Sequence, residues 1–405
     1  MMSPSNPYDF PTNPDVIIVD LETTIRNVGP EAVGSSKASP HCEANEIVAV
    51  GNWLFTEKHP RIVSVGHSIK KLRMFEIPTV LVGHNVKFDL LYLLKSWNTL
   101  VDDMSTHLSN LYLWDTMVVE YLLSGQQIRM PSLETTAERN KIKFKKDDKI
   151  KKYWDEGIDT DKIPEDELLE YLEEDVRVTR NIYVEQVSKA IRLGMMPLIK
   201  TRMEQWLATA IMEYNGMHID LDIFATEMAR TNGNATSWYA SLKVDLPDVD
   251  INSPKQLSTW LYGGEKKVKV DVPVLDAEGK YTYYKSGFKK GLPKLKKEVK
   301  TEIITGALPS SVISTLRTDE QDTSEETFKI LQGNKAVPSG IRNILYKLLQ
   351  YREWSKQYNT YFVGVGNYIW PDRRIHGNLN EAVTVTGRLA SSNPNLQNLP
   401  SYSEE

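Results

Sequence analysis

The stretch Val16-Ile-Ile-Val-Asp-Leu-Glu-Thr-Thr24 decides the fold of this chain. It is a short apolar run that changes into Asp20-x-Glu22, and a buried strand would deliver two carboxylates in this way at its carboxyl end. We therefore expect a strand from Val16 to Asp20 that places both acids at one edge of a sheet.

Two later segments bring further acids. Gly83-His-Asn-Val-Lys-Phe-Asp89 follows the apolar run Val80–Val82. This order predicts a strand that leads into a helix capped by Asn85, with Asp89 about one turn inside the helix. The third segment, Tyr171-Leu-Glu-Glu-Asp175, sets a phenol and a carboxylate four residues apart, hence on one face of a helix.

Four carboxylates and one phenol from three segments would form a cluster of oxygen ligands. Such a cluster repels itself unless cations fill it, and hard divalent ions prefer carboxylate oxygens. Two metal ions about 3.5–4 Å apart, clamping the attacking and leaving oxygens of a phosphodiester, are a common use of this chemistry. Taken singly, each segment also fits an acidic turn or a solvated helix face. The conjunction of all three predicts phosphodiester hydrolysis with two Mg²⁺ or Mn²⁺ ions.

The three motifs, in this order, resemble the tyrosine-bearing branch of the DEDD exonuclease superfamily, which includes the proofreading domains of family A DNA polymerases. The resemblance implies a ribonuclease-H-like α/β fold and 3′-to-5′ exonuclease activity. It further implies that Asp20, Glu22 and Asp175 bind the metal ion that activates water. Asp20 would bridge to the second ion, which Asp89 helps to hold, and Tyr171 would orient the attacking water.

Residues 1–192 are thus predicted to form the exonuclease domain, an α/β sheet whose acids gather at strand ends. Asp115 also ends an apolar run and matches a strand-end aspartate of the same family, and we interpret it as structural or supporting. The pattern then becomes helical. Ile199–Tyr214 is a long amphipathic stretch that ends at Asn215-Gly216, as a helix C-terminus does.

Residues 193–374 resemble a family A polymerase thumb. Tyr351-Arg-Glu-Trp-Ser-Lys356 is similar to the long thumb helix of that family, and we expect a helix from about Ser339 to Val363. Arg352 and Lys356 lie one turn apart in it and could reach DNA phosphates.

A lysine-rich insertion interrupts this thumb at about residues 263–318. The stretch between Glu265 and Lys300 contains eleven lysines and five acidic residues, with tyrosines interspersed among them. Lysines bind phosphates and aromatic rings stack on bases, so we expect Lys289 and Lys290 to contact DNA. The alternative is a docking surface for an acidic partner, such as a processivity factor. A second basic run, with seven lysines between Lys141 and Lys152, predicts either nucleic-acid contact or a solubilising loop.

The stretch Thr386-Gly-Arg-Leu-Ala-Ser-Ser-Asn-Pro-Asn-Leu-Gln-Asn-Leu-Pro400 is similar to the element that opens the family A palm, which predicts an incomplete palm over residues 375–405. In that family the residues matching Arg388, Asn393 and Gln397 face the primer-template. The groups that perform nucleotidyl transfer lie beyond this element in the family. We therefore expect DNA synthesis only with a second polypeptide that carries the remaining palm and the fingers.

The amino-acid composition limits the classes of protein to which this chain can belong, but it does not identify one of them. The 405 residues are 40% hydrophobic and 25% charged, as in soluble proteins of two or three domains. The net charge of -5 does not itself indicate a nucleic-acid partner. A single cysteine, Cys42, excludes an internal disulfide and fits a reducing compartment. No apolar run reaches the roughly 18 residues of a membrane span, so we expect no membrane partner and a cytoplasmic location, the host cytoplasm if the protein is phage-encoded.

The sequence thus predicts the proofreading exonuclease, thumb and first palm strands of a phage-type family A replicative polymerase, acting on single-stranded 3′ ends and primer-template DNA. Two alternatives remain open. One is a stand-alone DEDD-type exonuclease, and the other is a non-catalytic DNA-binding polymerase subunit.

Overall fold

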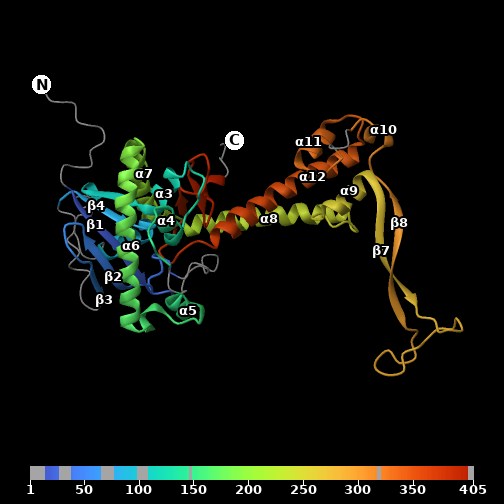
Figure 1. The fold of residues 1–405 in the computed structure, drawn as a ribbon. Coiled ribbons are helices and arrows are strands. Elements are labelled where there is room, and N and C mark those ends of the chain that lie inside the picture. The colour runs from blue at the N-terminus through green and yellow to red at the C-terminus, as the bar shows by residue number, and fades with distance from the viewer. Residues whose placement is uncertain are drawn as a thin grey trace. The chain divides into compact units, whose positions relative to one another are not determined.

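The computed structural model describes residues 14–26, 38–64, 77–97, 108–145, 148–316 and 321–399. Two compact units divide the chain (Figure 1). Unit 1 combines Met1–Leu221 with Gly364–Glu405, and unit 2 is Asp222–Val363. Within the described part, no helix is both long enough and apolar enough to cross a membrane.

A five-stranded mixed sheet forms the centre of unit 1, in the order β3-β2-β1-β4-β5. β1 pairs antiparallel with β2 and parallel with β4, and β5 continues the parallel half. The apolar runs of the sequence become the buried middle of the sheet: every residue of β4 is buried. The bounds are β1 (Asp15–Thr23), β2 (Ile47–Leu54), β3 (Arg61–Ser64), β4 (Thr79–Gly83) and β5 (Leu111–Asp115).

Helices follow the parallel strands and cover the sheet. Their bounds are α1 (Val86–Trp97), α3 (Thr116–Leu123), α4 (Leu133–Arg139), α5 (Lys149–Asp155), the 3-10 turn η4 (Thr160–Lys162), α6 (Glu165–Arg192) and α7 (Met196–Asn215). The helix predicted after Asn85 is present as α1, and the one predicted to carry Tyr171 and Asp175 is present as α6. The short elements β3, α4 and α5 have no clear apolar period in the sequence and were not predicted.

The compact units differ from the three domains predicted by sequence. α7 belongs to unit 1 because its buried side chains Met203 and Trp206 join the core of the sheet. The segment after Gly364 returns to unit 1 as well, through short strands. β6 (Met217–His218) pairs with β9 (Arg374–Ile375), and β10 (Asn378–Asn380) pairs with β11 (Ala390–Ser392), which precedes the 3-10 turn η7 (Leu396–Asn398).

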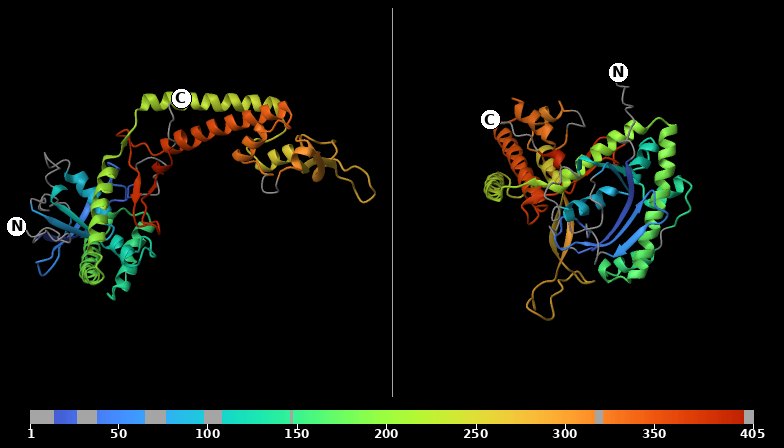
Figure 2. Two further views of the ribbon diagram at one scale, coloured as in Figure 1. Left: turned by 90° about the horizontal axis from the view of Figure 1, so that it is seen from above. Right: turned by 90° about the vertical axis from the view of Figure 1, so that its left-hand side faces the viewer.

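Unit 2 is built on two long helices that lie side by side (Figures 1 and 2). Aromatic side chains join α8 (Leu221–Asp245) to α12 (Ser339–Lys356), including Trp238 against Tyr346 at 5.9 Å between ring centroids. The remaining helices are α9 (Pro254–Tyr262), α10 (Ser310–Ile313) and α11 (Glu325–Gly333), and α12 continues as the π-helix η6 (Gln357–Gly364). The predicted helix from Ser339 to Val363 is therefore present, with a change of winding at Gln357.

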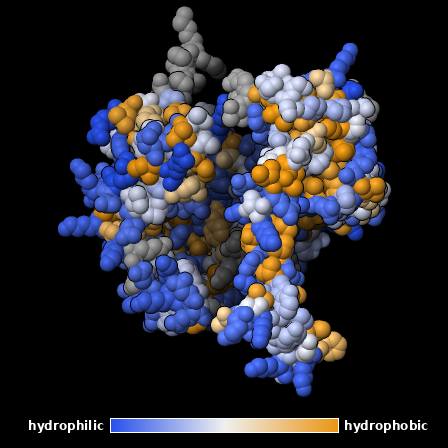
Figure 3. Space-filling view, turned by 90° about the vertical axis from the view of Figure 1, so that its right-hand side faces the viewer, coloured by the Kyte–Doolittle hydropathy of each residue, from blue (hydrophilic) through white to orange (hydrophobic). Residues whose placement is uncertain are grey.

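The lysine-rich insertion is a long antiparallel hairpin. β7 (Gly263–Pro273) pairs with β8 (Leu295–Thr305) over its whole length. Only Ile304 of β8 is partly covered, and all its other residues are exposed. Figure 3 shows apolar and charged side chains exposed together on the face that carries this hairpin. Val299 is 58% and Ile303 87% exposed, so the hairpin contributes little to the core of unit 2.

Candidate active site and nucleic-acid contacts

Asp20 and Glu22 lie two residues apart on β1 and so point to the same face of the sheet. The strand continues to Thr23 because β2 pairs with it that far, so both acids lie inside the strand and not after it. Gly51 is the cross-strand partner of Asp20, and a Cβ there would meet Val176 at 2.6 Å and Leu172 at 3.0 Å. Paired residues share a face, so the two acids point toward α6, and glycine lets that helix approach.

Asp89 stands in the first turn of α1 and is only 3% exposed. Its Oδ1 accepts a hydrogen bond of 3.0 Å from the backbone N–H of Leu21, the residue between the two acids of β1. Burial, and then the charge of Asp20, raise the pKa of Asp89 well above its ordinary value. The first two motifs of the sequence are therefore brought together at one point of the sheet.

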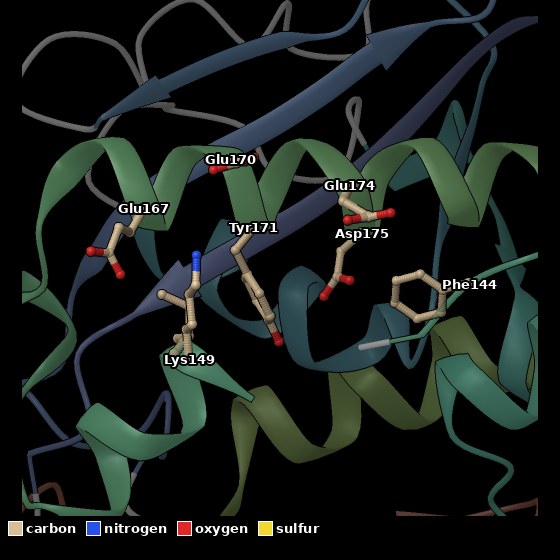
Figure 4. Close-up of a pocket in the computed structure, with 8 residues that line it drawn as sticks. Phe144, Lys149, Glu167, Glu170, Tyr171, Glu174 and Asp175 are labelled. Carbon is tan, nitrogen blue, oxygen red and sulfur yellow. The ribbon is translucent and has the colours of Figure 1, made fainter. Parts of the chain in front are cut away.

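Tyr171 and Asp175 lie on one face of α6, as predicted, and line a pocket (Figure 4). Both side chains point away from the helix axis to the same side, with Phe144 beside Asp175. Asp175 is 5% exposed, and the Tyr171 ring meets Trp154 edge-on at 6.4 Å between centroids. Glu167, Glu170 and Glu174 also line this pocket.

Lys149 is a pocket residue that the sequence did not single out. It extends from α5 into the pocket that Tyr171 and Asp175 line (Figure 4). The sequence shows it only as one of seven lysines in a basic run, and no pattern separates it from the others. The structure thus places a cation at the edge of the acidic group, where it can attract a phosphate.

Asp115 has the structural role expected of it. It is fully buried, caps α3 and accepts hydrogen bonds from the backbone N–H groups of Met117 and Val118. Its other contacts reach Asn85 N at 3.0 Å and Trp206 Nε1 at 2.9 Å. It therefore joins the turn before α1 to α7.

The donor set of the site fits hard divalent cations, since all four candidate ligands are carboxylates. Asp20, Glu22 and Asp89 meet at β1 and α1, while Tyr171 and Asp175 meet on α6. Across the described residues, no group of three or more His, Cys, Asp or Glu side chains is already arranged to hold a metal ion. The chemistry of the ligands is thus present, and the ligand role of each stays a prediction.

The predicted DNA contacts of unit 2 differ in their surroundings. Arg352 donates to the carbonyl oxygen of Thr323 at 2.5 Å and lies 4.6 Å over the ring of Phe328. Its guanidinium group therefore makes contacts within unit 2, and the sequence alone does not reveal these contacts. Lys356, one turn later, is exposed, as are Lys289 and Lys290 in the hairpin loop.

The DNA contacts predicted for residues 375–405 lie on the surface of that segment. Arg388, Asn393 and Gln397 are all exposed. The Gln397 side chain donates to the carbonyl oxygen of Leu389 at 3.2 Å, which folds η7 back on the strand β11. Pro400, the last residue of the motif, lies outside the described residues.

Comparison with known proteins agrees with the palm motif. Residues 301–405 match the profile of DNA polymerase family A. Residues 301–405 of the chain are therefore similar to family A DNA polymerases. The thermostable DNA polymerase I of Thermus aquaticus is 40% identical over 87 residues, which are 21% of this chain and 10% of that protein. DNA polymerase I of Bacillus subtilis (strain 168) is 44% identical over 64 residues, or 16% of this chain and 7% of that protein.

The fold as a whole also resembles a family A structure. A solved structure described as the POL domain of Pol1 from M. smegmatis, in complex with DNA primer-template and dNTP, matches with a TM-score of 0.55. The match covers 96% of this chain and 53% of that chain at 16% identity. This chain therefore spans about half of that structure and a small part of the length of the curated relatives. At 16% identity, the match to the solved structure shows a similar fold and no more.

Proposed function

We propose that this chain is the exonuclease, thumb and initial palm part of a family A replicative DNA polymerase, and that it removes 3′-terminal nucleotides from DNA by hydrolysis. One observation carries the proposal. Asp89 bonds to the backbone of Leu21, between Asp20 and Glu22, and the face of β1 that bears these acids is covered by the helix that bears Tyr171 and Asp175. The strand order also supports the ribonuclease-H-like fold expected from the motifs.

Each residue has a defined part in this proposal. Asp20, Glu22 and Asp175 would hold one Mg²⁺ or Mn²⁺ ion, and Asp20 and Asp89 the other. When bound, such ions lower the pKa of water and neutralise charge on the phosphodiester. The phenol of Tyr171 orients the attacking water from α6. Lys149 attracts the phosphate of the terminal nucleotide into the pocket.

The partners follow from the related proteins and from the exposed cations. Arg388, Asn393 and Gln397 would contact primer-template DNA, with Lys356 and the hairpin lysines on its phosphates. Two further partners expected from the sequence remain predictions: a second polypeptide that carries the rest of the palm and the fingers, and a processivity factor at the hairpin.

Digestion of labelled single-stranded DNA with Mg²⁺ tests the proposal. Asp20→Ala should reduce nucleotide release to background and leave the fold intact, because removing one acid relieves repulsion on Asp89. Asp15→Ala is the matched control, since Asp15 lies on the same strand at its opposite end.

The outcome separates the alternatives. If Asp20→Ala releases nucleotides at the wild-type rate, the site is wrongly assigned. If the wild-type chain binds DNA and releases none, the non-catalytic DNA-binding subunit is the better interpretation. Release from RNA and not from DNA would favour a stand-alone exonuclease of the superfamily.

A further inference from the structure

Lys87 is a buried cation that the proposed chemistry does not use. It lies on α1, two residues before Asp89, and is 5% exposed. Its Nζ lies 2.8 Å from Glu213 Oε1 of α7 and donates to the carbonyl oxygen of Leu379 in β10 at 2.5 Å. The ammonium also lies 3.9 Å from the centroid of the Trp206 ring.

Lys87 and Glu213 together bind Leu379 of the palm segment, and we call this group of contacts the clamp. The backbone N–H of Leu379 donates to Glu213 Oε1, so the Lys87–Glu213 pair bonds both polar backbone groups of this residue. A pair of apolar side chains could fill the same volume. It could not form hydrogen bonds with the backbone of Leu379, and so it would not fix which residue of β10 lies against α1 and α7. A buried ion pair is weak evidence for stability and better evidence for a specific geometry.

The clamp is connected to Asp89 by covalent structure and by buried contacts. Lys87 and Asp89 share the first turn of α1. Trp206, beneath the Lys87 ammonium, donates to Asp115, which accepts from the backbone N–H of Asn85 just before α1. Asn85, just before the turn that carries Asp89, and Lys87, within that turn, are thus both tied to α7, and α7 is tied to β10.

We propose that Lys87 and Glu213 are positioning residues of the exonuclease site, which fasten the first turn of α1 to the palm strand β10 and so hold Asp89 in place. The inference rests on the proposed exonuclease function. In this proposal the strand β10 has two roles: it belongs to the beginning of the palm, and it holds part of the nuclease site in position.

The test compares three variants of the full chain in the Mg²⁺-dependent digestion of single-stranded DNA. Lys87→Met and Glu213→Gln should each lower kcat about tenfold and leave KM for DNA unchanged, since displacements near 1 Å can cost about a hundredfold. Lys95→Met is the matched control. Lys95 is also on α1, but it donates to the carbonyl oxygens of Cys42 and Asn45 at the far end of the helix. It should lower stability and keep kcat.

Hydrogen–deuterium exchange gives a readout that does not need activity. Peptides that cover β10 and β1 should exchange faster in Lys87→Met, because Lys87 no longer holds in place the carboxylates of Glu213 and Asp89, which accept from the Leu379 and Leu21 amides. If Lys87→Met does not fold, Glu213→Gln decides, since it keeps the size of the side chain and removes the negative charge that pairs with Lys87.

Two failures are distinguishable. A wild-type kcat and wild-type exchange in folded Glu213→Gln and Lys87→Met would overturn the positioning role and leave the exonuclease proposal standing. A wild-type chain that releases no nucleotide would overturn the exonuclease proposal. In that case unchanged exchange at β1 in Lys87→Met would also exclude the mechanical link.

Discussion

Glu381 should make unit 1 less stable as the pH rises, and Glu381→Gln should remove that dependence. The side chain is 1% exposed, and no residue in the described part of the chain forms a hydrogen bond with either carboxylate oxygen. Burial raises the pKa of Glu381 to about 7, and the charges of Arg202 and Lys87 offset only part of this effect. The folded chain therefore binds a proton that the unfolded chain has already lost.

The sign and size follow from linkage. The pKa of this carboxyl is raised on folding from 4.5 to about 7. Between these two pH values the folded state binds more protons, so the free energy of unfolding falls as the pH rises and levels off above about pH 7. At about 1.4 kcal/mol for each pH unit, the loss is about 3 kcal/mol. A glutamine resembles the neutral acid, so Glu381→Gln should gain about 3 kcal/mol at pH 8 and nothing at pH 4.5.

Urea unfolding between pH 5 and pH 8 measures this difference. Glu353→Gln, at an exposed position of α12, serves as the control for adding an amide elsewhere. Equal pH dependence of stability in Glu381→Gln and the wild-type chain would refute the reasoning, because it would mean that the buried carboxyl does not titrate between the two limits.

Two further predictions concern the site and the hairpin. Tyr171→Phe should slow hydrolysis about a hundredfold without changing metal affinity, since the phenol positions water and is not a ligand; a large loss of metal binding in calorimetry would contradict this role. Neutralising five hairpin lysines should flatten the salt dependence of primer-template affinity by about four units. An unchanged slope would favour protein docking. The five are Lys289, Lys290, Lys294, Lys296 and Lys297.

The central sheet could be predicted because its signals are local. The run Val80–Val82 is apolar and fully buried, and such a run identifies a strand without knowledge of its neighbours. The same holds for the spacing of Tyr171 and Asp175, which one helix turn places on one face. Asp115 was also interpreted correctly as structural, because it stands where a strand hands over to a helix that needs a cap.

The missed features depend on partners far along the chain. Lys87 stands inside a motif that was recognised, yet its acceptors are 126 and 292 residues away. The guanidinium group of Arg352 bonds to a carbonyl group 29 residues earlier, and its helical position alone suggests solvent exposure. Another example is α7, which lies beyond the predicted boundary at residue 192 and yet packs into the core of the sheet. Its amphipathic pattern shows that one face is buried, but not that the sheet of the preceding domain buries it.

The buried charges of unit 1 gather where α1 and α7 meet β10. Lys87 and Glu213 bond the backbone of β10, and Glu381 follows that strand by one residue. Burial lowers the pKa of Lys87 and raises that of Glu213. Each group therefore loses favourable hydration free energy when it is charged in the folded protein. Apolar side chains would pack there at lower cost but would not fix which residue of β10 meets α1 and α7. This interface therefore favours a defined register over maximal stability, as expected if Asp89 of α1 and the strand β10 must keep one geometry.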